Sequence, residues 1–437
     1  MQTGAREAAL ETLMRCRRDG AWSGASIDAG IKKYELSRRD AALASRLCLG
    51  VIQNSSLCDY YIGCCCGAKL EPKVRDILRM GVYQLLFLDR IPARAAVSEA
   101  VALCKSQGCA RAAGLVNAVL RRIADNINSL PPIPGEGTAG YLSIKYSHPE
   151  WLVQYIIDRK GYDFTEEFLR CCNSPAPLSI QVNTLKVSAA DYARALARAE
   201  LEYERCDEPE GCITLPGGSA TELPGFDEGL FYVQDRAARM AVEIAAPKAG
   251  MRVLDACSCP GGKSFAAAIA MENCGSILSC DIHEKKLRLV RDGAQRLGID
   301  IIETAAMDAR AFRAELAESF DIVIADVPCS GFGVIAKKPE IRSKTPESIA
   351  ELPKIQGEIL DNVSKYVCPG GVLLYSTCTV TAEENENTVK AFLERNGEYT
   401  AEPFEVCGVS APEGMYTFWP NVDGTDGFFA AKLRKRQ

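Results

Sequence analysis

Two cysteines of this sequence stand in contexts that suit covalent chemistry. Cys329 lies in the motif Asp326-Val-Pro-Cys-Ser-Gly331 and Cys378 in Tyr375-Ser-Thr-Cys378, and each motif follows an apolar run typical of a buried strand. Neighbouring strands of one parallel sheet bring their carboxyl ends to the same edge, where open α/β sheets bind ligands. The sequence therefore predicts that both thiols meet at one ligand-binding edge, where either could form a covalent bond to a substrate.

A third predicted strand end carries a turn of small residues, in the segment Val253-Leu-Asp-Ala-Cys-Ser-Cys-Pro-Gly-Gly-Lys263. The turn is not a Walker loop, because Cys257 stands where that loop needs a glycine, and the fingerprint Gly-x-Gly-x-x-Gly is also absent. Carboxylates stand at the ends of the first three predicted strands, at Asp255, Asp281 and Asp308. The second suits ribose hydroxyls and the third suits a base, so S-adenosylmethionine fits this edge better than ATP or NAD.

A thiolate would solve a problem that cytosine methylation presents. Carbon-5 of the ring is too electron-poor to attack a methyl sulfonium, but addition of a thiolate to carbon-6 makes carbon-5 nucleophilic. Asp326 is placed to hold N3 and N4 of the ring and to favour the charge that builds there. A base must then remove the carbon-5 proton so that the thiolate can leave. Free thiols are mostly protonated at neutral pH, so the strand ends and the helix amino end after Pro260 must favour the thiolate.

The elements that must position these motifs alternate between strand and helix from Met251 onward, which predicts a doubly wound, Rossmann-like α/β domain over residues 236–437. Helices are predicted at Lys285–Leu297 and Ala382–Arg395, and Pro369-Gly-Gly371 predicts a sharp turn into the fifth strand. The predicted strands are Arg252–Ala256, Ser276–Ile282, Ile301–Ala306, Asp321–Ala325, Val372–Ser376 and Gly427–Leu433.

Two further domains are predicted ahead of this one. Residues 1–130 form an all-α domain, because apolar residues recur at helical spacing from Val74 to Leu86 and from Leu115 to Ile123. A Pro- and Gly-rich linker, Leu130–Gly140, follows. Residues 141–235 form a small α+β domain, which is either a substrate platform or an ordinary extension. Its predicted elements are strands Leu178–Val182, Cys212–Leu215 and Leu230–Gln234, and a helix Ser188–Leu201 capped by Ser188.

Charge is spread unevenly along a chain whose net charge is −6. Residues 1–140 carry 19 Lys and Arg against 13 Asp and Glu, whereas the remainder carries 32 against 44. A basic front on an acidic chain suits a domain that meets the phosphates of a nucleic acid, although a merely soluble domain would also accommodate it.

Composition excludes several classes of protein. The 47% hydrophobic and 25% charged residues describe a soluble globular chain. The charged first twenty residues lack a signal peptide, and the apolar run Met80–Leu88 is too short to span a bilayer, so a cytoplasmic protein without a membrane partner is expected. Only His148 and His283 are present, and no paired Cys-x-x-Cys array occurs, so no metal site is expected among the twenty cysteines.

Taken together, the motifs resemble the signature set of the RNA cytosine-5 methyltransferases. The helical front, which ends in Val116-Asn-Ala-Val-Leu-Arg-Arg-Ile123, resembles the NusB-type RNA-binding domain. This combination is typical of the bacterial enzymes that methylate one cytosine of 16S small-subunit rRNA. Further segments that are similar to family elements are Ser147-His-Pro-Glu-Trp-Leu-Val153, Phe231-Tyr-Val-Gln-Asp235 and Asp426-Gly-Phe-Phe429.

The resemblance implies roles for individual residues. Cys378 would be the nucleophile, and Cys329 would assist release of the product, although the Pro-Cys position is the nucleophile in the related DNA enzymes. The implied cofactor is S-adenosylmethionine, the implied partner is small-subunit rRNA, and a monomer is expected. Cys257, Ser258, Cys259, Pro260, Gly261, Gly262, Lys263, Asp281, Asp308 and Asp326 would bind or align the cofactor.

The chain departs from the family pattern at three places. Cys259 replaces a common alanine, Gln181 stands where arginine is usual, and Lys338-Pro-Glu-Ile-Arg-Ser343 lacks the frequent Asp and Trp. Two alternative functions stay open at this point. One is a cytosine-5 methyltransferase that acts on tRNA or large-subunit rRNA, and the other is a non-catalytic NusB-like RNA-binding factor.

Overall fold

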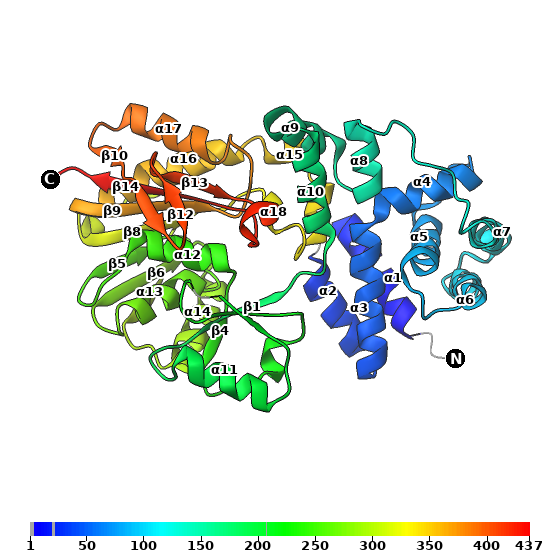
Figure 1. The fold of residues 1–437 in the computed structure, drawn as a ribbon, viewed down its shortest axis with the longest axis horizontal. Coiled ribbons are helices and arrows are strands. Elements are labelled where there is room, and N and C mark those ends of the chain that lie inside the picture. Colours follow the sequence, from blue (N-terminus) through cyan, green and yellow to red (C-terminus); the bar gives the residue numbers. More distant parts are fainter. Residues whose placement is uncertain (1–3, 20–21, 207) are drawn as a thin grey trace. The chain divides into compact units, whose positions relative to one another are not determined.

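The computed structural model describes residues 4–19, 22–206 and 208–437. They form two compact units (Figure 1). Unit 1 comprises Met1–Ser174 together with Ile335–Thr345, and unit 2 comprises Pro175–Val334 and Pro346–Gln437. Residues 1–3 and 20–21 of the predicted all-α domain, and residue 207 of the predicted small domain, lie outside the described residues. The predicted boundaries 1–130, 141–235 and 236–437 stay a prediction.

Unit 1 is built of helices, as predicted for the front of the chain. The helical spacing is confirmed in α7, where Val116, Val119, Leu120 and Ile123 are buried in the core, although Leu115 is 37% exposed. Within the described ranges, every helix of the chain falls short of the length and apolar character needed to cross a membrane. The helices of unit 1 are α1 Gly4–Asp19, α2 Ser23–Lys33, α3 Arg38–Gln53, α4 Ser55–Cys65, α5 Pro72–Phe87, α6 Ala93–Ser106, α7 Ala113–Asp125, α8 Ala139–Tyr146, α9 Glu150–Lys160 and α10 Tyr162–Asn173.

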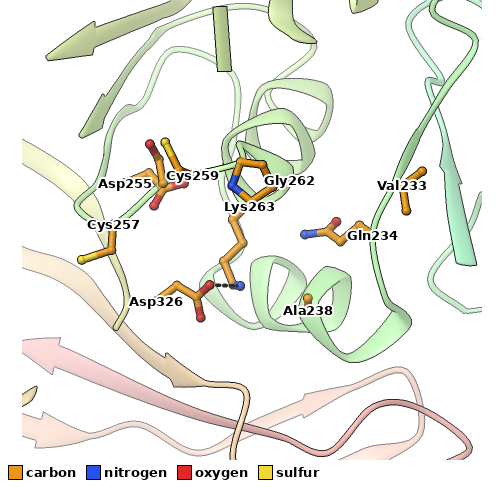
Figure 2. A pocket seen from close by; sticks show the side chains of 11 residues that line it. Val233, Gln234, Ala238, Asp255, Cys257, Cys259, Gly262, Lys263 and Asp326 are labelled. Carbon is orange, nitrogen blue, oxygen red and sulfur yellow. Dashed lines mark hydrogen bonds and ion pairs between the residues drawn. The ribbon is translucent and has the colours of Figure 1, made fainter. Parts of the chain in front are cut away.

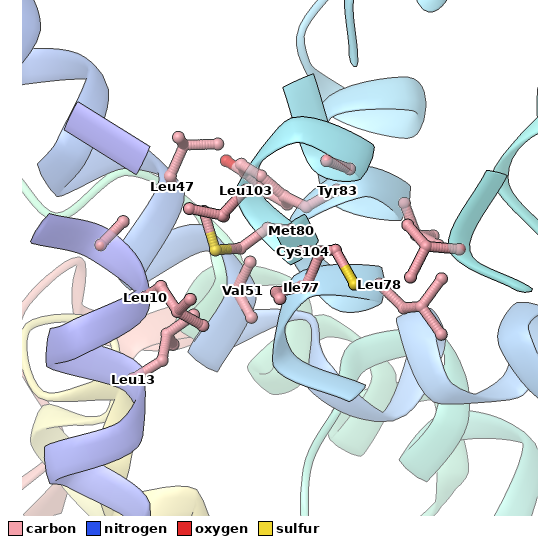
Figure 3. Packing of buried hydrophobic residues seen from close by; sticks show 14 of the residues in the cluster. Leu10, Leu13, Leu47, Val51, Ile77, Leu78, Met80, Tyr83, Leu103 and Cys104 are labelled. Carbon is pink, nitrogen blue, oxygen red and sulfur yellow. The ribbon is translucent and has the colours of Figure 1, made fainter. Parts of the chain in front are cut away.

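The core of unit 1 gathers side chains from α1, α3, α5 and α6, among them Leu10, Val51 and Ile77 (Figure 3). Helix α3 packs against α5 with Gly50 facing Tyr83. A Cβ added there would lie 2.0 Å from a ring carbon of Tyr83, whose side chain is buried. The absence of a side chain at Gly50 therefore allows the two helices to pack at this distance.

Unit 2 begins with a small antiparallel sheet in the order β2-β3-β1-β4. Strands β1 Leu178–Val182 and β3 Cys212–Leu215 have the predicted bounds, while β2 Glu204–Arg205 and β4 Phe231–Val233 complete the sheet. Helix α11, Ala189–Arg198, packs against it, and the predicted cap is confirmed, because Ser188 accepts a hydrogen bond from the Asp191 backbone N–H at 3.1 Å.

The larger sheet of unit 2 has the order β10-β14-β9-β8-β5-β6-β7. Neighbours from β9 to β7 run parallel, and β14 lies antiparallel to β9, as the predicted α/β class requires. Helices α12 Arg236–Ala245, α13 Gly262–Ala270, α14 Glu284–Leu297, α16 Leu352–Val363 and α17 Glu386–Arg395 join the strands. The strands are β5 Arg252–Asp255, β6 Ser276–Asp281, β7 Ile302–Ala306, β8 Phe320–Asp326, β9 Val367–Thr377, β10 Tyr399–Ala401 and β14 Phe428–Lys435, with β13 Met415–Phe418 beside β14.

Both faces of this sheet are buried. Along β8, Ile322 and Ile324 belong to one apolar cluster, whereas Val323 and Ala325 belong to the other. Side chains alternate between the faces of a strand, so the continuous apolar run of β8 fills two cores, one on each side. The polar motifs are thus left at the strand ends.

Two of the differences between predicted and observed bounds have a clear structural cause. Pro369-Gly-Gly371 does not form a turn ahead of the fifth strand but lies inside β9, because Val367 already pairs with Phe320 and a bulge in the β8–β9 register accommodates the three residues. Helix α17 begins at Glu386 rather than at residue 382, because residues 382–385 form a turn in which Glu384 and Asn385 are buried.

Candidate active site

The motifs meet where the order of the parallel strands reverses. The chain runs from β5 outward through β6 to β7 on one side, and from β8 to β9 on the other. This switch point between β5 and β8 is where open α/β sheets form a ligand crevice. The carboxyl ends of β5, β8 and β9 carry the small-residue turn and the two cysteine motifs.

A pocket of about 180 Å³ opens beside the small-residue turn (Figure 2). Of the predicted cofactor residues, Gly261, Asp281 and Asp308 do not line it. The lining residues are Val233, Gln234, Ala238, Asp255, Cys257, Ser258, Cys259, Pro260, Gly262, Lys263 and Asp326.

The turn is held by backbone hydrogen bonds, one of them to β6, and needs glycine. The backbone N–H of Ser258 donates to the Cys280 carbonyl at 2.7 Å, and that of Gly261 donates to the Ser258 carbonyl at 2.6 Å. Gly261 has φ +115°, and a Cβ there would lie 2.5 Å from the Phe265 ring. The turn therefore presents backbone rather than side chains as it enters α13, whose amino end favours electron-rich ligand atoms.

The polar groups around the pocket fit a nucleoside sulfonium without phosphates. Burial raises the pKa of Asp255 to about 7, and Ser264 Oγ donates to its Oδ2 at 2.7 Å. Burial, together with the charge of Asp281, raises the pKa of Cys259 to about 12, so this thiol stays neutral. The buried Oε1 of Gln234 has no hydrogen-bond partner among the described residues, so it is available to a ligand in the pocket.

Lys263 does not offer a free cation to a phosphate. Its buried Nζ lies 2.6 Å from Asp326 Oδ2 and 4.9 Å from the centre of the Phe428 ring. The other oxygen of Asp326 accepts a hydrogen bond from Ser376 Oγ at 2.9 Å. This pair of contacts fixes the Asp326 carboxylate at the end of β8. Reasoning from the sequence missed Ser376, although its place in the Cys378 motif was a signal.

Asp281 and Asp308 lie outside the pocket lining, at the ends of β6 and β7. Asp281 Oδ1 accepts a hydrogen bond from the His283 backbone N–H at 2.8 Å. Asp308 is engaged by Arg310, whose Nε and Nη2 lie 3.1 and 2.9 Å from its oxygens, and this hydrogen bonding lowers the pKa of Asp308. A ligand that binds Asp308 must therefore share it with Arg310.

The structure brings the two motif cysteines together. Cys329 Sγ and Cys378 Sγ lie 3.1 Å apart, and the backbone N–H of Cys378 donates to Cys329 Sγ at 3.3 Å. Both residues are partly exposed. The hydrogen bond to Cys378, followed by burial, raises the pKa of Cys329 well above that of a free thiol. The raised pKa favours the protonated form of Cys329, and a protonated Cys329 can donate to Cys378 Sγ, which would favour a thiolate on Cys378.

The departures from the family pattern have structural explanations. Gln181 Nε2 donates to the Gln234 carbonyl and to Cys212 Sγ, so it serves the small sheet. The segment around the 3₁₀ helix Pro339–Ser343 packs within unit 1, where Arg342 Nη2 donates to Asn173 Oδ1. Within the described ranges, no group of three or more His, Cys, Asp and Glu side chains is arranged to hold a metal ion.

Three family models match this chain. Residues 3–125 match the NusB family, residues 148–222 match the RsmF/B-like methyltransferase ferredoxin-like domain, and residues 242–434 match the 16S rRNA methyltransferase RsmB/F. Together with the observed elements, these matches confirm the predicted fold class of a NusB-like helical front, a small α+β domain and a Rossmann-like methyltransferase domain.

Curated relatives match over nearly the whole chain. A probable ribosomal RNA small subunit methyltransferase B of Bacillus subtilis is 35% identical, with 100% of this chain and 99% of that protein covered. The ribosomal RNA small subunit methyltransferase B of Vibrio cholerae is 33% identical, with 92% of each covered. Among solved structures, PH0851 has a TM-score of 0.84 at 27% identity and covers 100% of this chain and 99% of its own. A methyltransferase homolog of Pyrococcus horikoshii has a TM-score of 0.59 at 26% identity, with 67% of this chain and 97% of its own covered.

Proposed function

The chain belongs to the 16S rRNA methyltransferase RsmB/F family, and from that premise we propose that it methylates carbon-5 of one cytosine in 16S rRNA through a covalent cysteine adduct. The observation that carries the proposal is the pair of thiols 3.1 Å apart at the same edge of the sheet as the small-residue turn. Addition–elimination on a pyrimidine ring needs one nucleophilic thiol, and a second thiol beside it is placed to assist the release of the product.

The turn Cys257–Lys263 would hold S-adenosylmethionine, whose sulfonium supplies the methyl group. The backbone of the turn and the amino end of α13 bind the electron-rich atoms of such a ligand. Asp281 would bind its ribose, and Asp308 with Arg310 would flank its base. Asp326, fixed by Lys263 and Ser376, lines this pocket and lies three residues before Cys329, and it would accept a hydrogen bond from the cytosine amino group.

The thiols divide the work of addition and elimination. Cys378 attacks carbon-6 as the thiolate, and the electron pair displaced in the ring makes carbon-5 the methyl acceptor. After transfer, carbon-5 loses its proton to a base, the electron pair returns to the ring and the bond from carbon-6 to the Cys378 sulfur breaks. Cys329, next to the same sulfur, assists this release.

Bisulfite mapping of rRNA and tRNA from cells with and without this gene tests the proposal. One protected cytosine in 16S rRNA that disappears with the gene is the expected result. Loss of protection in tRNA or 23S rRNA instead would assign a different substrate, and unchanged protection in all RNAs would contradict the enzyme assignment. The cytoplasmic location and the monomeric state stay predictions.

A further inference from the structure

A buried carboxylate lies against the two loops that carry the cysteine motifs. Glu384 is 1% exposed and lies in the turn between β9 and α17. Its Oε2 accepts hydrogen bonds from the backbone N–H of Ser330 and from Gln356 Nε2, each at 2.8 Å, and its Oε1 accepts one from Thr381 Oγ1 at 2.8 Å. Three donors from three separate segments therefore converge on one side chain.

On one side, these contacts fix the peptide groups that flank Cys329. Gln356 comes from α16, and its Nε2 donates to the Pro328 carbonyl at 3.0 Å as well as to Glu384. Pro328 and Ser330 are the neighbours of Cys329 in the chain. Glu384 thus holds one neighbour directly and the other through Gln356.

On the other side, the same turn is tied to the Cys378 loop. Thr381, which donates to Glu384, lies three residues after Cys378. A second link joins the loops directly, since Ser330 Oγ and Thr379 Oγ1 lie 2.6 Å apart. The distance between the two sulfurs therefore depends on a polar network centred on Glu384.

We propose that Glu384 is a positioning residue that holds the two thiols in contact and keeps the proton on Cys329, so that Cys378 is the thiol that ionises. The role of this arrangement in catalysis rests on the proposed function. The positions and protonation of the two thiols are properties of the free protein and are testable without RNA. Both thiols lie at the ends of adjacent strands, so their place in the sheet does not distinguish them. The contacts of Glu384 provide a difference between the two.

The charge of Glu384 acts in the direction that the proposal requires. Within the described residues, Glu384 forms no ion pair. Because the carboxylate is buried, water screens the electrostatic interaction between its charge and neighbouring groups only weakly. That charge is among the causes that raise the pKa of Cys329, after the Cys378 hydrogen bond and burial. The titratable and charged groups that face Cys329 are Cys378, Asp326, Glu384 and Tyr375, with Lys263 paired to Asp326.

Replacement by glutamine separates the charge from the hydrogen bonds. In Glu384→Gln, the amide oxygen can accept from Ser330 and Gln356, and the amide N–H can donate to the Thr381 hydroxyl, so the network survives without the charge. Glu384→Asp keeps the charge and shortens the reach. Glu383→Gln is the matched control, because Glu383 is an exposed neighbour that loses the same charge.

The experiment measures alkylation of both cysteines in the full-length protein. Iodoacetamide is applied over a range of pH, and mass spectrometry of the peptides gives a rate for each thiol. Cys378 is expected to react faster than Cys329 in the unsubstituted protein. In Glu384→Gln, the curve of Cys329 alkylation rate against pH (the Cys329 profile) should move to lower pH by about one unit. Below the midpoint of the curve, this shift makes the reaction about tenfold faster. Glu384→Asp, which keeps the charge but loses reach, should shift the profile less than Glu384→Gln does, and Glu383→Gln should keep the original profile.

A Cys329 profile that is the same in Glu384→Gln and Glu383→Gln would overturn the inference. So would a Glu384→Asp profile shifted as far as that of Glu384→Gln, because the charge would then not be the cause. Alkylation needs no RNA and no cofactor. A shifted profile in a protein that methylates no RNA would therefore support the positioning of the thiols while contradicting the proposed function.

Discussion

At the residue scale, the two motif cysteines differ in their surroundings rather than in their chemistry. The pKa of Cys329 is raised, so we expect Cys378 to be the better nucleophile of the pair. The two alanine variants should therefore fail at different steps. Cys378→Ala should lower methylation at least about 10³-fold and form no adduct with RNA. Cys329→Ala should form the adduct but release it slowly, with turnover lowered by about 10²-fold.

The measurement is a denaturing gel of each variant after incubation with 16S rRNA and S-adenosylmethionine. A retarded protein–RNA band is expected for Cys329→Ala alone. Cys274→Ala, at an exposed cysteine, is the control for general effects of removing a thiol. A retarded band in Cys378→Ala and none in Cys329→Ala would exchange the roles of the two residues.

Asp255 makes the stability of unit 2 depend on pH. Burial raises its pKa to about 7 in the folded chain, from an ordinary value of 3.8. Between these values the folded state binds a proton that the unfolded state has released. The free energy of unfolding therefore falls as the pH rises from about 4 to about 7, by up to about 4 kcal/mol, and levels off above the folded pKa.

Asp255→Asn should remove this decline. Urea unfolding of the full-length protein at several pH values measures it, with Asp292→Asn as the control, because Asp292 is exposed on α14. The slope of unfolding free energy against pH between 4 and 7 should be smaller in Asp255→Asn than in the control. Equal slopes in the two variants would show that Asp255 is ionised in the folded protein.

At the element scale, the packing of unit 1 depends on a close helix crossing. Gly50→Ala would place a Cβ 2.0 Å from the Tyr83 ring, which is buried and stacks on Phe87 at 5.1 Å. Either the ring or the helices must move, so the unfolding free energy is expected to fall by about 1–3 kcal/mol. Gly63→Ala in α4 is the control, since nothing lies within 4 Å of its new Cβ. That variant should be neutral or more stable by up to about 1 kcal/mol in urea unfolding.

The sequence was sufficient to predict the elements that carry regular apolar patterns. Strands β1 and β3 have the predicted bounds, and β5, β6 and β8 differ from their predictions by one residue at one or both ends, because a parallel strand buried on both faces has a continuous apolar run. Proximity of Cys329 and Cys378 followed from the same reasoning, since adjacent strands end at one edge.

Other features depend on contacts between segments that are distant in the sequence. Pro369-Gly-Gly371 lies within β9 because the strand already pairs with Phe320 before it. The local sequence, which is typical of a turn, carries no information about this pairing. Glu384 is one of three glutamates within four residues, and its burial follows from donors on α16 and on the Cys329 loop. Asp308 and Arg310 are two residues apart in the chain. Only the geometry shows that Arg310 occupies the Asp308 carboxylate, so that a ligand would have to compete for it.

At the scale of the whole molecule, the chain passes between the two units three times, after Ser174, Val334 and Thr345. The segment Ile335–Thr345, which belongs to unit 1, follows the loop of Cys329 by a few residues. Within unit 1 it is held by Glu340, which accepts hydrogen bonds from the Ser23 backbone N–H and hydroxyl at 3.1 and 2.8 Å. The covalent chain thus leads directly from the Cys329 motif into the unit that carries the NusB match.

Unit 1 carries the excess of basic residues in the front of the chain, so we expect its exposed arginines to bind the phosphates of rRNA. Arg121 and Arg122 are exposed on α7, opposite its buried face. The double variant Arg121→Ala, Arg122→Ala should bind 16S rRNA fragments more weakly. The slope of its binding constant against salt concentration, both on logarithmic scales, should be shallower by about one for each arginine that bound a phosphate. Filter binding over a series of salt concentrations measures this slope. Arg288→Ala, an exposed arginine of unit 2, is the matched control. A slope that falls in the control but not in the double variant would assign the phosphate contacts to unit 2, where the acidic part of the chain would have to present a local basic surface.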